Sequence, residues 1–305
     1  MLSNLTILKT LNGYSFKESE TKTDEKSLIL NTTDRGKIED VNLILHIIKE
    51  PTPEKLTYDL FDRVNRGGTR LNNQEMRNAI YQGSATGFLK ALSLLKSFKL
   101  ATSNISSTRM KDRYLVLRFV SFYLWRKNIS KDIDSKESSK IEYKSDLEDF
   151  LAKSMMFLNT LEFKFNVNDV NNESEIVVEK ADDIFIRIFK SFDTSMSNIF
   201  DAFNENSFRL PKKDGGVRRP INMALFEVIT YFFIELESEY LSHKDFIISE
   251  YYKLINNYDF EISKKEEDDF IESLTYTVDS NKSVYRRFEI IDKKIKLIKG
   301  YVKNN

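Results

Sequence analysis

Very few residues in this chain can interrupt a helix. Its 305 residues include only nine glycines and four prolines, whereas 31% are charged and Leu, Ile, Lys and Glu are abundant. Glycine and proline destabilise helix interiors most, so their scarcity leaves long stretches free to remain helical. We therefore predict a mainly α fold: a multi-helix domain with a short β-hairpin near the N-terminus.

Amphipathic segments with the helical period support this fold class. The clearest is residues 109–127, RMKDRYLVLRFVSFYLWRK, whose apolar face predicts the core helix of the domain. Trp125 near its end is interpreted as a packing residue rather than a ligand platform. Further helices are predicted from residue 4 to Asn12-Gly13 and over 54–64, 72–83, 87–98, 146–165, 181–203, 224–241 and about 245–301.

The predicted hairpin and loops divide the chain into parts. Residues 27–33 and 40–49 are rich in β-branched and apolar side chains on either side of Asp34-Arg35-Gly36, which predicts a two-stranded hairpin. Residues 128–145 and 166–175 are polar, which predicts a flexible loop and a second loop. Four parts are predicted. They are residues 1–53 with the hairpin, 54–127 with a glycine-containing loop and the core helices, the loop 128–145, and the helical region 146–305 with a basic hairpin at 207–222.

Composition narrows the possible functions. The chain has no cysteine and only two histidines, His46 and His243, so we expect no disulfide, no zinc site, no haem and no HNH-type nuclease site. Lys+Arg and Asp+Glu both number 47, so any contact with DNA must come from local basic patches. Neither a signal peptide nor a membrane-spanning run is recognisable, so we expect a cytoplasmic protein with no membrane partner.

Residues 60–83, LFDRVNRGGTRLNNQEMRNAIYQG, are the strongest candidate for a phosphate site. Gly67 and Gly68 follow Arg63 and Asn65 at a helix break, where backbone N–H groups can face one concavity and the next helix adds positive potential. The alternative is an ordinary Gly-Gly turn with Arg63 in a surface ion pair, and the local pattern alone favours that turn.

The next helix begins with Asn72 as a candidate N-cap, followed by Gln74, Glu75 and Arg77. Glu75 can cap its own helix or pair with Arg77 or Arg63. The spacing from Asn72 is a variant of the capping box and favours the capping role.

A second candidate site is the basic segment FRLPKKDGGVRRP. It carries five cations against Asp214 alone: Arg209, Lys212, Lys213, Arg218 and Arg219. Such a segment can lie along a phosphate backbone, and it can equally serve solubility.

The segment FDRVNRGGTRLNNQEMRNAIYQG resembles the F-x-R-[IV]-N-x-G-G-x-x-L-x-x-Q-E-x-R-x-A signature of the N-terminal domain of GmrSD-type restriction endonucleases, whose core is similar to ParB and sulfiredoxin. The blocks RMKDRYLVLRFVSFY, ENSFRLPKKDGGVRRPINMALFEVI and SLTYTVDSNKSVYRRFEII resemble later helical blocks of that family in the same order.

The resemblance implies a nucleotide-dependent component of a bacterial restriction or anti-phage system that acts on DNA, often modified DNA. A nucleoside triphosphate with Mg²⁺ would be the cofactor. The nucleotide or phosphate would be bound by Arg63, Asn65, Gly67, Gly68, Gln74, Glu75 and Arg77, and DNA by the five cations of the basic segment. The family's Asp-Gly-Gln-Gln-Arg motif and its HNH domain are absent from this sequence, so we do not expect the chain to be catalytic alone.

Three explanations for the missing motif remain open: a split protein whose partner chain supplies it, a truncated product, or a degenerate paralogue. Apolar surface on the hairpin and on helix 54–64 predicts association with a partner chain or with itself. The alternative function is a structural or protein-interaction module that binds neither nucleotide nor DNA.

Overall fold

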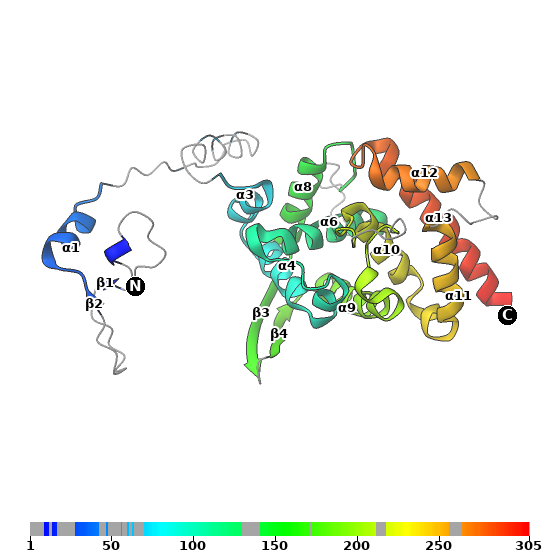
Figure 1. The fold of residues 1–305 in the computed structure, drawn as a ribbon, viewed down its shortest axis with the longest axis horizontal. Helices are drawn as coiled ribbons and strands as arrows, with labels where there is room; N and C mark the ends of the chain where they lie inside the picture. Colours follow the sequence, from blue (N-terminus) through cyan, green and yellow to red (C-terminus); the bar gives the residue numbers. More distant parts are fainter. Residues whose placement is uncertain are drawn as a thin grey trace. The chain divides into compact units, whose positions relative to one another are not determined.

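The chain forms two compact units, Met1–Thr57 and Tyr58–Asn305 (Figure 1). The computed structural model describes residues 9–11, 14–16, 28–42, 47, 56, 60, 63, 70–129, 141–170, 173–211, 218–255 and 264–304. The fold is mainly helical, as the scarcity of glycine and proline predicted. The boundary between the units falls close to the predicted division after residue 53.

The N-terminal unit contains a strand pair, but not the predicted hairpin. A 3-10 turn, η1 (Lys9–Leu11), precedes β1 (Tyr14–Ser15), which pairs in parallel with β2 (Leu28–Ile29). Residues 32–39, which include the expected hairpin turn, form helix α1 (Thr32–Glu39) instead. The second expected strand, 40–49, lies largely outside the described residues.

Local capping explains why α1 replaces the turn. The Asn31 side chain accepts a hydrogen bond from the Asp34 backbone N–H at 2.8 Å, and its amide donates to the Asp34 carboxylate at 2.8 Å. Asn is among the best N-cap residues, and an acid in the first turn interacts favourably with the helix dipole. These local bonds outweigh the β-branched composition on which the hairpin prediction depended.

The second unit is a helical assembly with one long hairpin (Figure 1). Its first elements are α3 (Asn73–Ile80), α4 (Ser84–Leu94), α5 (Lys96–Ala101), η3 (Thr108–Met110), α6 (Lys111–Arg126) and α8 (Leu147–Asn159). The remaining elements are β3 (Phe163–Val170), β4 (Glu173–Ala181), α9 (Asp183–Phe203), η5 (Asn204–Asn206), α10 (Met223–Glu235), α11 (Glu237–Ile255), α12 (Lys264–Thr275) and α13 (Asn281–Asn304).

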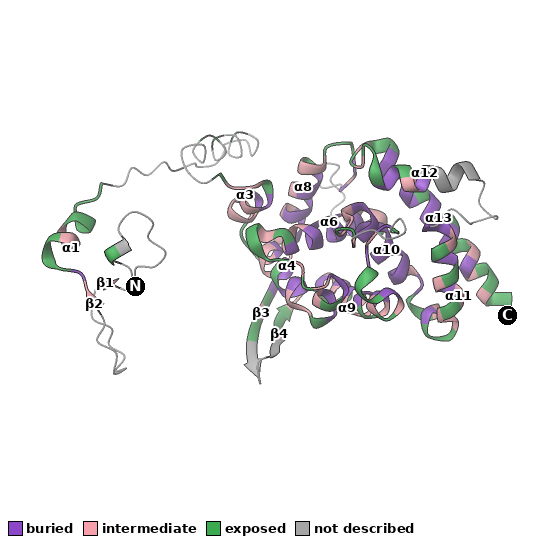
Figure 2. Cartoon of the chain, viewed as in Figure 1, coloured by how far each residue is buried: buried purple, intermediate pink, exposed green. Residues whose placement is uncertain are grey.

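Helices α6 and α10 form the centre of this unit. α6 packs against α4, α8 and α10, and α10 also packs against α9 and α13. Both central helices are buried around most of their circumference, and the other helices cover them with one apolar face (Figure 2). Residues 111–126 of the predicted segment 109–127 form α6, so the prediction of a core helix is confirmed, while Arg109 and Met110 belong to η3.

Trp125 packs in an aromatic cluster near the end of α6. Its ring centroid lies 5.1 Å from that of Tyr285 and 5.9 Å from that of Phe288, both in edge-to-face geometry. Phe150 of α8 approaches from another side, with a centroid distance of 6.4 Å. The prediction that Trp125 is a packing residue is confirmed.

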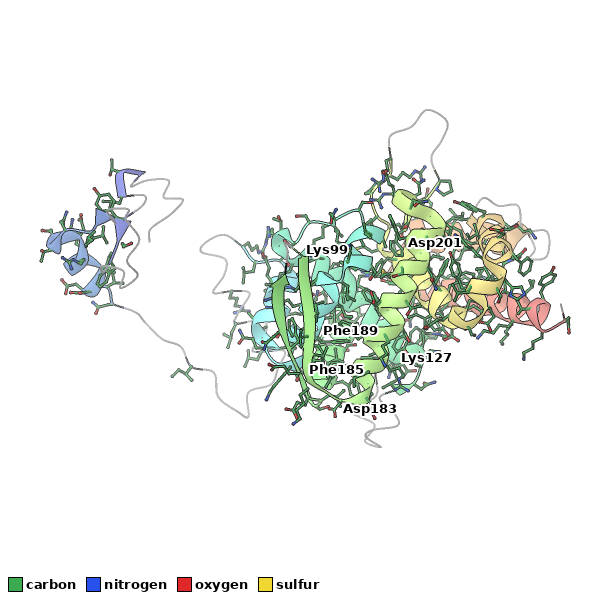
Figure 3. The ribbon with its side chains drawn as sticks, turned by 90° about the horizontal axis from the view of Figure 1, so that it is seen from below. Lys99, Lys127, Asp183, Phe185, Phe189 and Asp201 are labelled. Atoms are coloured by element: carbon green, nitrogen blue, oxygen red, sulfur yellow. The ribbon has the colours of Figure 1, made fainter. Side chains whose placement is uncertain are left out.

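Residues 166–175, predicted as a loop, belong to an antiparallel hairpin instead. Strand β3 pairs with β4 from Phe163 opposite Ala181 to Val170 opposite Glu173. Phe163 is buried against Phe185 of α9, with ring centroids 5.1 Å apart, so the base of the hairpin joins the core. Figure 3 labels Phe185 and Phe189 on α9, which lies beside the strands. The sequence did not predict this strand because both of its faces are partly exposed, so its alternating Val and Asn side chains resemble a polar loop.

The predicted loop 128–145 is also anchored in the core where the structure describes it. Ile129, Ile141 and Tyr143 are all buried, and the Tyr143 hydroxyl donates to the Asp279 carbonyl oxygen. Residues 130–140 lie outside the described residues. The predicted helices 87–98 and 224–241 are each divided in two, at Leu95 and at Leu236.

Candidate functional site

The N-terminus of α3 is built by a complete capping box. The Asn72 side-chain oxygen accepts from the Glu75 N–H at 2.9 Å, and Glu75 Oε2 accepts from the Asn72 N–H at 2.7 Å. The Asn72 N–H lowers the pKa of the Glu75 carboxyl; partial burial opposes this shift, and Arg109 adds to it. The predicted capping role of Glu75 is therefore confirmed, and its ion-pair partner is Arg109 rather than Arg63 or Arg77.

Arg109 fixes the chain that leads into α3. Its guanidinium donates to Glu75 Oε2 at 3.1 Å and to the Arg70 carbonyl oxygen at 2.6 Å, while its own carbonyl accepts from the Asn72 side-chain amide at 2.8 Å. Arg109 and Met110 both have left-handed backbones, with φ of 56° and 58°. Two such non-glycine residues in succession are uncommon and carry strain. The strained turn holds Arg109 beside the start of α3.

Arg77 is almost completely buried, with 1% exposure. It donates from Nε and Nη2 to Gln74 Oε1, at 3.2 and 3.0 Å, and pairs through Nη1 with Glu148 of α8. Its guanidinium lies 5.5 Å from the centre of the Tyr114 ring. Arg77 thus joins α3 to α6 and α8, and it orients both Gln74 and Glu148.

These residues line a cavity of about 570 Å³ between α3, η3, the start of α6 and α8. The volume lies within the usual range for small-ligand sites, about 300 to 1,000 Å³. Lys111 is exposed at its rim. Gln74 Nε2 is buried and, among the described residues, has no hydrogen-bond partner. The lining residues are Asn72, Asn73, Gln74, Arg77, Thr108, Arg109, Lys111, Tyr114, Glu148 and Met223.

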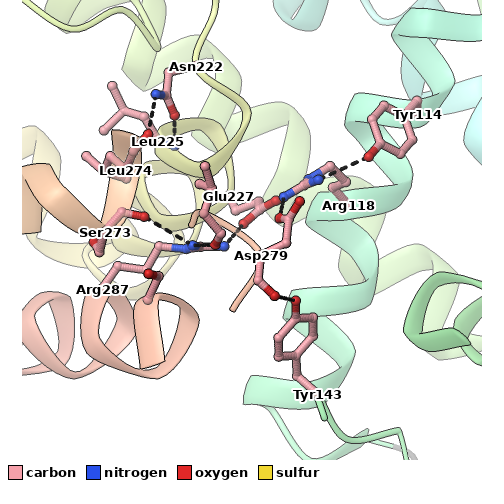
Figure 4. A network of polar contacts seen from close by, with 12 residues as sticks. Tyr114, Arg118, Tyr143, Asn222, Leu225, Glu227, Ser273, Leu274, Asp279 and Arg287 are labelled. Carbon is pink, nitrogen blue, oxygen red and sulfur yellow. Dashed lines mark hydrogen bonds and ion pairs between the residues drawn. The ribbon is translucent and has the colours of Figure 1, made fainter. Parts of the chain in front are cut away.

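Tyr114 connects this cavity to a buried charge network (Figure 4). Arg118 donates from Nη1 to the Tyr114 hydroxyl at 3.0 Å and from Nη2 to Asp279 at 2.7 Å. It also pairs through Nε with Glu227 of α10, which receives a second bond from Arg287 Nη2 at 2.8 Å. The side chains of Glu227 and Arg287 have no exposed surface. The network therefore holds Tyr114 in place from the interior of the unit.

The electrostatics of the network keep Arg118 charged. Burial opposes the charged form of Arg118, but Glu227 and Asp279 outweigh it and raise the pKa of the guanidinium. Burial also raises the pKa of Tyr143, which donates to the Asp279 carbonyl oxygen, to about 12. At neutral pH Arg118 is therefore a fixed cation and Tyr143 a neutral hydroxyl, and both act as parts of a scaffold.

The structure brings together only part of the predicted nucleotide site. Gln74, Glu75 and Arg77 all lie on α3, but each is engaged within the chain. Gln74 accepts from Arg77, Glu75 caps the helix and pairs with Arg109, and Arg77 pairs with Glu148. Arg63 is helical and exposed. The predicted residues Asn65, Gly67 and Gly68 lie outside the described residues.

The sequence analysis missed most of the cavity residues, among them the charged or aromatic Arg109, Lys111, Tyr114 and Glu148. Arg109 and Lys111 stand at the start of the segment that predicted the core helix. Their positive charges at that position could have marked them as candidate site residues. Nothing in the sequence indicates that Glu148 of α8 meets Arg77, because that contact depends on how α8 packs.

The basic segment 207–222 closes on itself, since the Asn222 N–H donates to the Phe208 carbonyl oxygen at 2.9 Å. Arg209, Arg218 and Arg219 line a second cavity, of about 280 Å³, next to α9 and α11. The predicted DNA-binding residues Lys212 and Lys213 lie outside the described residues.

In the ranges that the structure describes, no group of three or more His, Asp or Glu side chains is arranged to hold a metal ion. No helix in those ranges is long and apolar enough to cross a membrane. No family model, curated protein or solved structure matches the chain.

Proposed function

We propose that this chain is a nucleotide-binding component of a bacterial restriction or anti-phage system, and that it also contacts DNA. The observation that carries the nucleotide half is the cavity beside α3. The segment that resembles the GmrSD-type signature supplies part of its lining, and the cavity offers Lys111, Arg109 and the unpartnered Gln74 Nε2 as donors.

The donors of this cavity fit a phosphate. Lys111 is an exposed cation at the rim, and Gln74 Nε2 supplies a buried N–H group that is otherwise unsatisfied. The positive end of α3 adds a favourable potential for an anion. Mg²⁺ usually binds through substrate phosphates and one or two carboxylates, and Glu148 is the carboxylate in the lining. A nucleoside triphosphate with Mg²⁺ is therefore a suitable ligand for this cavity.

A thermal-shift titration with Mg²⁺-ATP and Mg²⁺-GTP tests the nucleotide half. A ligand at about 100 times its Kd stabilises the folded chain by about 2.7 kcal/mol, so one of the two should raise the Tm. Lys111→Ala should reduce that shift, because an exposed cation at the rim is lost without damage to the core.

Lys90→Ala on α4 is the matched control, since Lys90 is also an exposed lysine and does not line the cavity. If neither nucleotide shifts the Tm, or if Lys111→Ala and Lys90→Ala behave alike, the nucleotide half is wrong.

The proposed DNA contact depends on Arg209, Arg218 and Arg219, which all line the second cavity. Binding of duplex DNA measured over a salt series tests it. Release of counterions from several phosphates makes log K fall steeply with log[salt]. Arg219→Ala should lower both the affinity and the slope, while a flat salt response argues against DNA contact.

The alternative is a structural or protein-interaction module without ligand. One observation in its favour is that Gln74, Glu75 and Arg77 make hydrogen bonds or ion pairs within the chain, and these contacts stabilise the fold. It is also favoured by exposed Leu56 and Leu60, which leave 48% and 39% of their surface open for a partner chain or a second copy. Light scattering at increasing concentration tests association: a monomer at every concentration counts against self-association.

A further inference from the structure

The cavity beside the basic segment combines cations with aromatic rings. Arg209, Arg218 and Arg219 line it together with Tyr251 and Tyr252 of α11. No Asp or Glu is among its described lining residues. At about 280 Å³ it is close to the lower end of ligand cavities, about 300 Å³, and far too small for a double helix.

The arginines have unused hydrogen-bonding capacity. Arg209 donates from Nη1 to the Ser207 carbonyl oxygen at 3.1 Å. Arg218 pairs with the Glu205 carboxylate at 3.6 Å and donates from Nη2 to Ser103 Oγ and to the Glu205 carbonyl oxygen. The Nε atoms of Arg209 and Arg218 are buried and have no partner among the described residues. Burial lowers the pKa of Arg209 and the neighbouring charge of Arg218 lowers it further, while Glu205 opposes the shift. Buried donors, and three arginines that face one carboxylate, are what a bound anion would satisfy.

The position of Arg209 is fixed by a strained turn. Phe208 has a left-handed backbone with φ of 59°, which is unusual for a bulky residue, and its side chain is buried against Phe226 with ring centroids 4.6 Å apart. The turn at the end of α9 thus directs the next residue, Arg209, to the cavity lining.

The aromatic side of the cavity is a supported platform. Tyr251 is buried against Phe203, with ring centroids 4.4 Å apart, and Tyr252 packs on both rings at 5.5 and 5.8 Å. Tyr252 nevertheless keeps 42% of its surface exposed. An exposed ring held by two others can stack on a base, and a guanidinium fork suits a phosphate.

We infer that this cavity binds a single nucleotide unit, with its phosphate on Arg209, Arg218 and Arg219 and its unpaired base on Tyr252. The source we favour is single-stranded DNA or a nucleotide extruded from a duplex. This choice rests on the DNA contact in the proposed function. A free nucleotide offers the same chemistry. Bases in a duplex are stacked on one another, so they cannot reach the Tyr252 ring unless one leaves the stack.

The test compares ligands on the full chain by fluorescence anisotropy and calorimetry. The probes are a labelled single-stranded DNA of about one dozen nucleotides, the duplex of the same sequence, free dAMP and inorganic phosphate. Tyr252→Ala should weaken single-strand binding about 5- to 150-fold, the range found for the loss of one stacked base. Tyr252→Phe, which keeps the ring, should bind within about twofold of the parent chain.

Two surface substitutions serve as controls. Tyr276→Ala removes a ring with 70% exposure that does not line the cavity, and it should leave every affinity unchanged. Arg187→Ala removes an exposed cation on the same helix as Phe203, 16 residues or about 24 Å away along its axis, and should have little effect compared with Arg219→Ala.

The outcomes separate this inference from the proposed function. If duplex and single strand bind equally well and Tyr252→Ala changes neither affinity, the inference is overturned while DNA contact stands. If no DNA binds but dAMP binds in a Tyr252-dependent way, the nucleotide site stands with a free nucleotide as its source, and the DNA half fails. If inorganic phosphate binds as tightly as dAMP, the base makes no contribution and the inference is overturned.

Discussion

At the scale of single residues, Glu227 is the acidic side chain at the centre of the buried charge network. It is fully buried between two arginines, Arg118 and Arg287, and accepts a hydrogen bond from each. Two guanidinium groups this close repel each other unless a carboxylate separates them. The stability of the α6–α10–α13 centre therefore depends on the charge of one side chain.

Glu227→Gln should lower the free energy of unfolding by about 3–5 kcal/mol, because it preserves the shape but leaves buried arginine charge uncompensated. Urea denaturation monitored by circular dichroism measures this loss. Glu162→Gln, which removes a carboxylate paired with Lys164 and Lys180 on the surface, should produce no measurable change. Equal effects of the two substitutions would contradict the assignment.

Glu75 predicts a pH dependence. Its folded-state pKa lies below the ordinary value of 4.5, so the carboxylate contributes stability that is complete above about pH 4.5 and is lost as pH falls through the lower folded pKa. Glu75→Gln keeps an acceptor for the Asn72 N–H but removes the charge. The difference in unfolding free energy between parent and variant should therefore be constant near neutral pH and shrink in acid. Parallel stability curves down to pH 3 would exclude this role.

At the scale of elements, the join between α4 and α8 depends on a glycine. Gly83 has φ of 146°, and a Cβ at this position would lie 2.7 Å from Asn159 Oδ1. That oxygen accepts from the Ala85 N–H at 2.9 Å, in the first turn of α4. Gly83 thus allows α8 to supply a polar group to the N-terminus of α4.

Gly83→Ala should destabilise the chain by at least about 1 kcal/mol, because the backbone conformation is unfavourable for alanine and the contact with Asn159 must shift. Gly300→Ala on α13 is the matched control. Nothing lies within 4 Å of a Cβ there, so alanine should stabilise the helix by about 0.5–1 kcal/mol. Thermal denaturation of both variants should give shifts of opposite sign; shifts of the same sign would show that Gly83 is not constrained by the join.

At the scale of the whole molecule, the hydrophobic core belongs to one unit. Every residue of the main core cluster in the described chain lies between Ala85 and Ile298. The unit Tyr58–Asn305 therefore contains the groups whose burial drives its own folding, and both candidate cavities lie within it.

A fragment that begins at Tyr58 should fold by itself, with a Tm within about 2 °C of the main transition of the full chain, because 1 kcal/mol corresponds to about 2–4 °C for a domain of this size. Differential scanning calorimetry measures both. A fragment that begins at Lys96 lacks buried Phe88 and Leu89 of α4 and should not fold cooperatively. A fall of more than about 4 °C for the first fragment would show that residues 1–57 stabilise the second unit.

Sequence reasoning succeeded where the signal is local. The capping box of α3 needs only Asn72 and Glu75, three positions apart, and the core helix α6 needs only its apolar pattern. It failed at α1, where the cap at Asn31 outweighed the β-branched composition. It also failed at the β3–β4 hairpin, because strands with two exposed faces do not show a clear alternation of apolar and polar residues.

The amino-acid sequence was sufficient to predict that the chain is mainly helical, where most helices lie, and which segments carry concentrated positive charge. These properties depend on propensity and periodicity, which act over a few residues. Only the tertiary structure decided that Arg77 is buried against Glu148, 71 positions away, and that Tyr252 lies beside Arg209 and Arg218. Such contacts depend on how distant helices pack, because the hydrophobic effect that drives packing is not directional and does not by itself select partners.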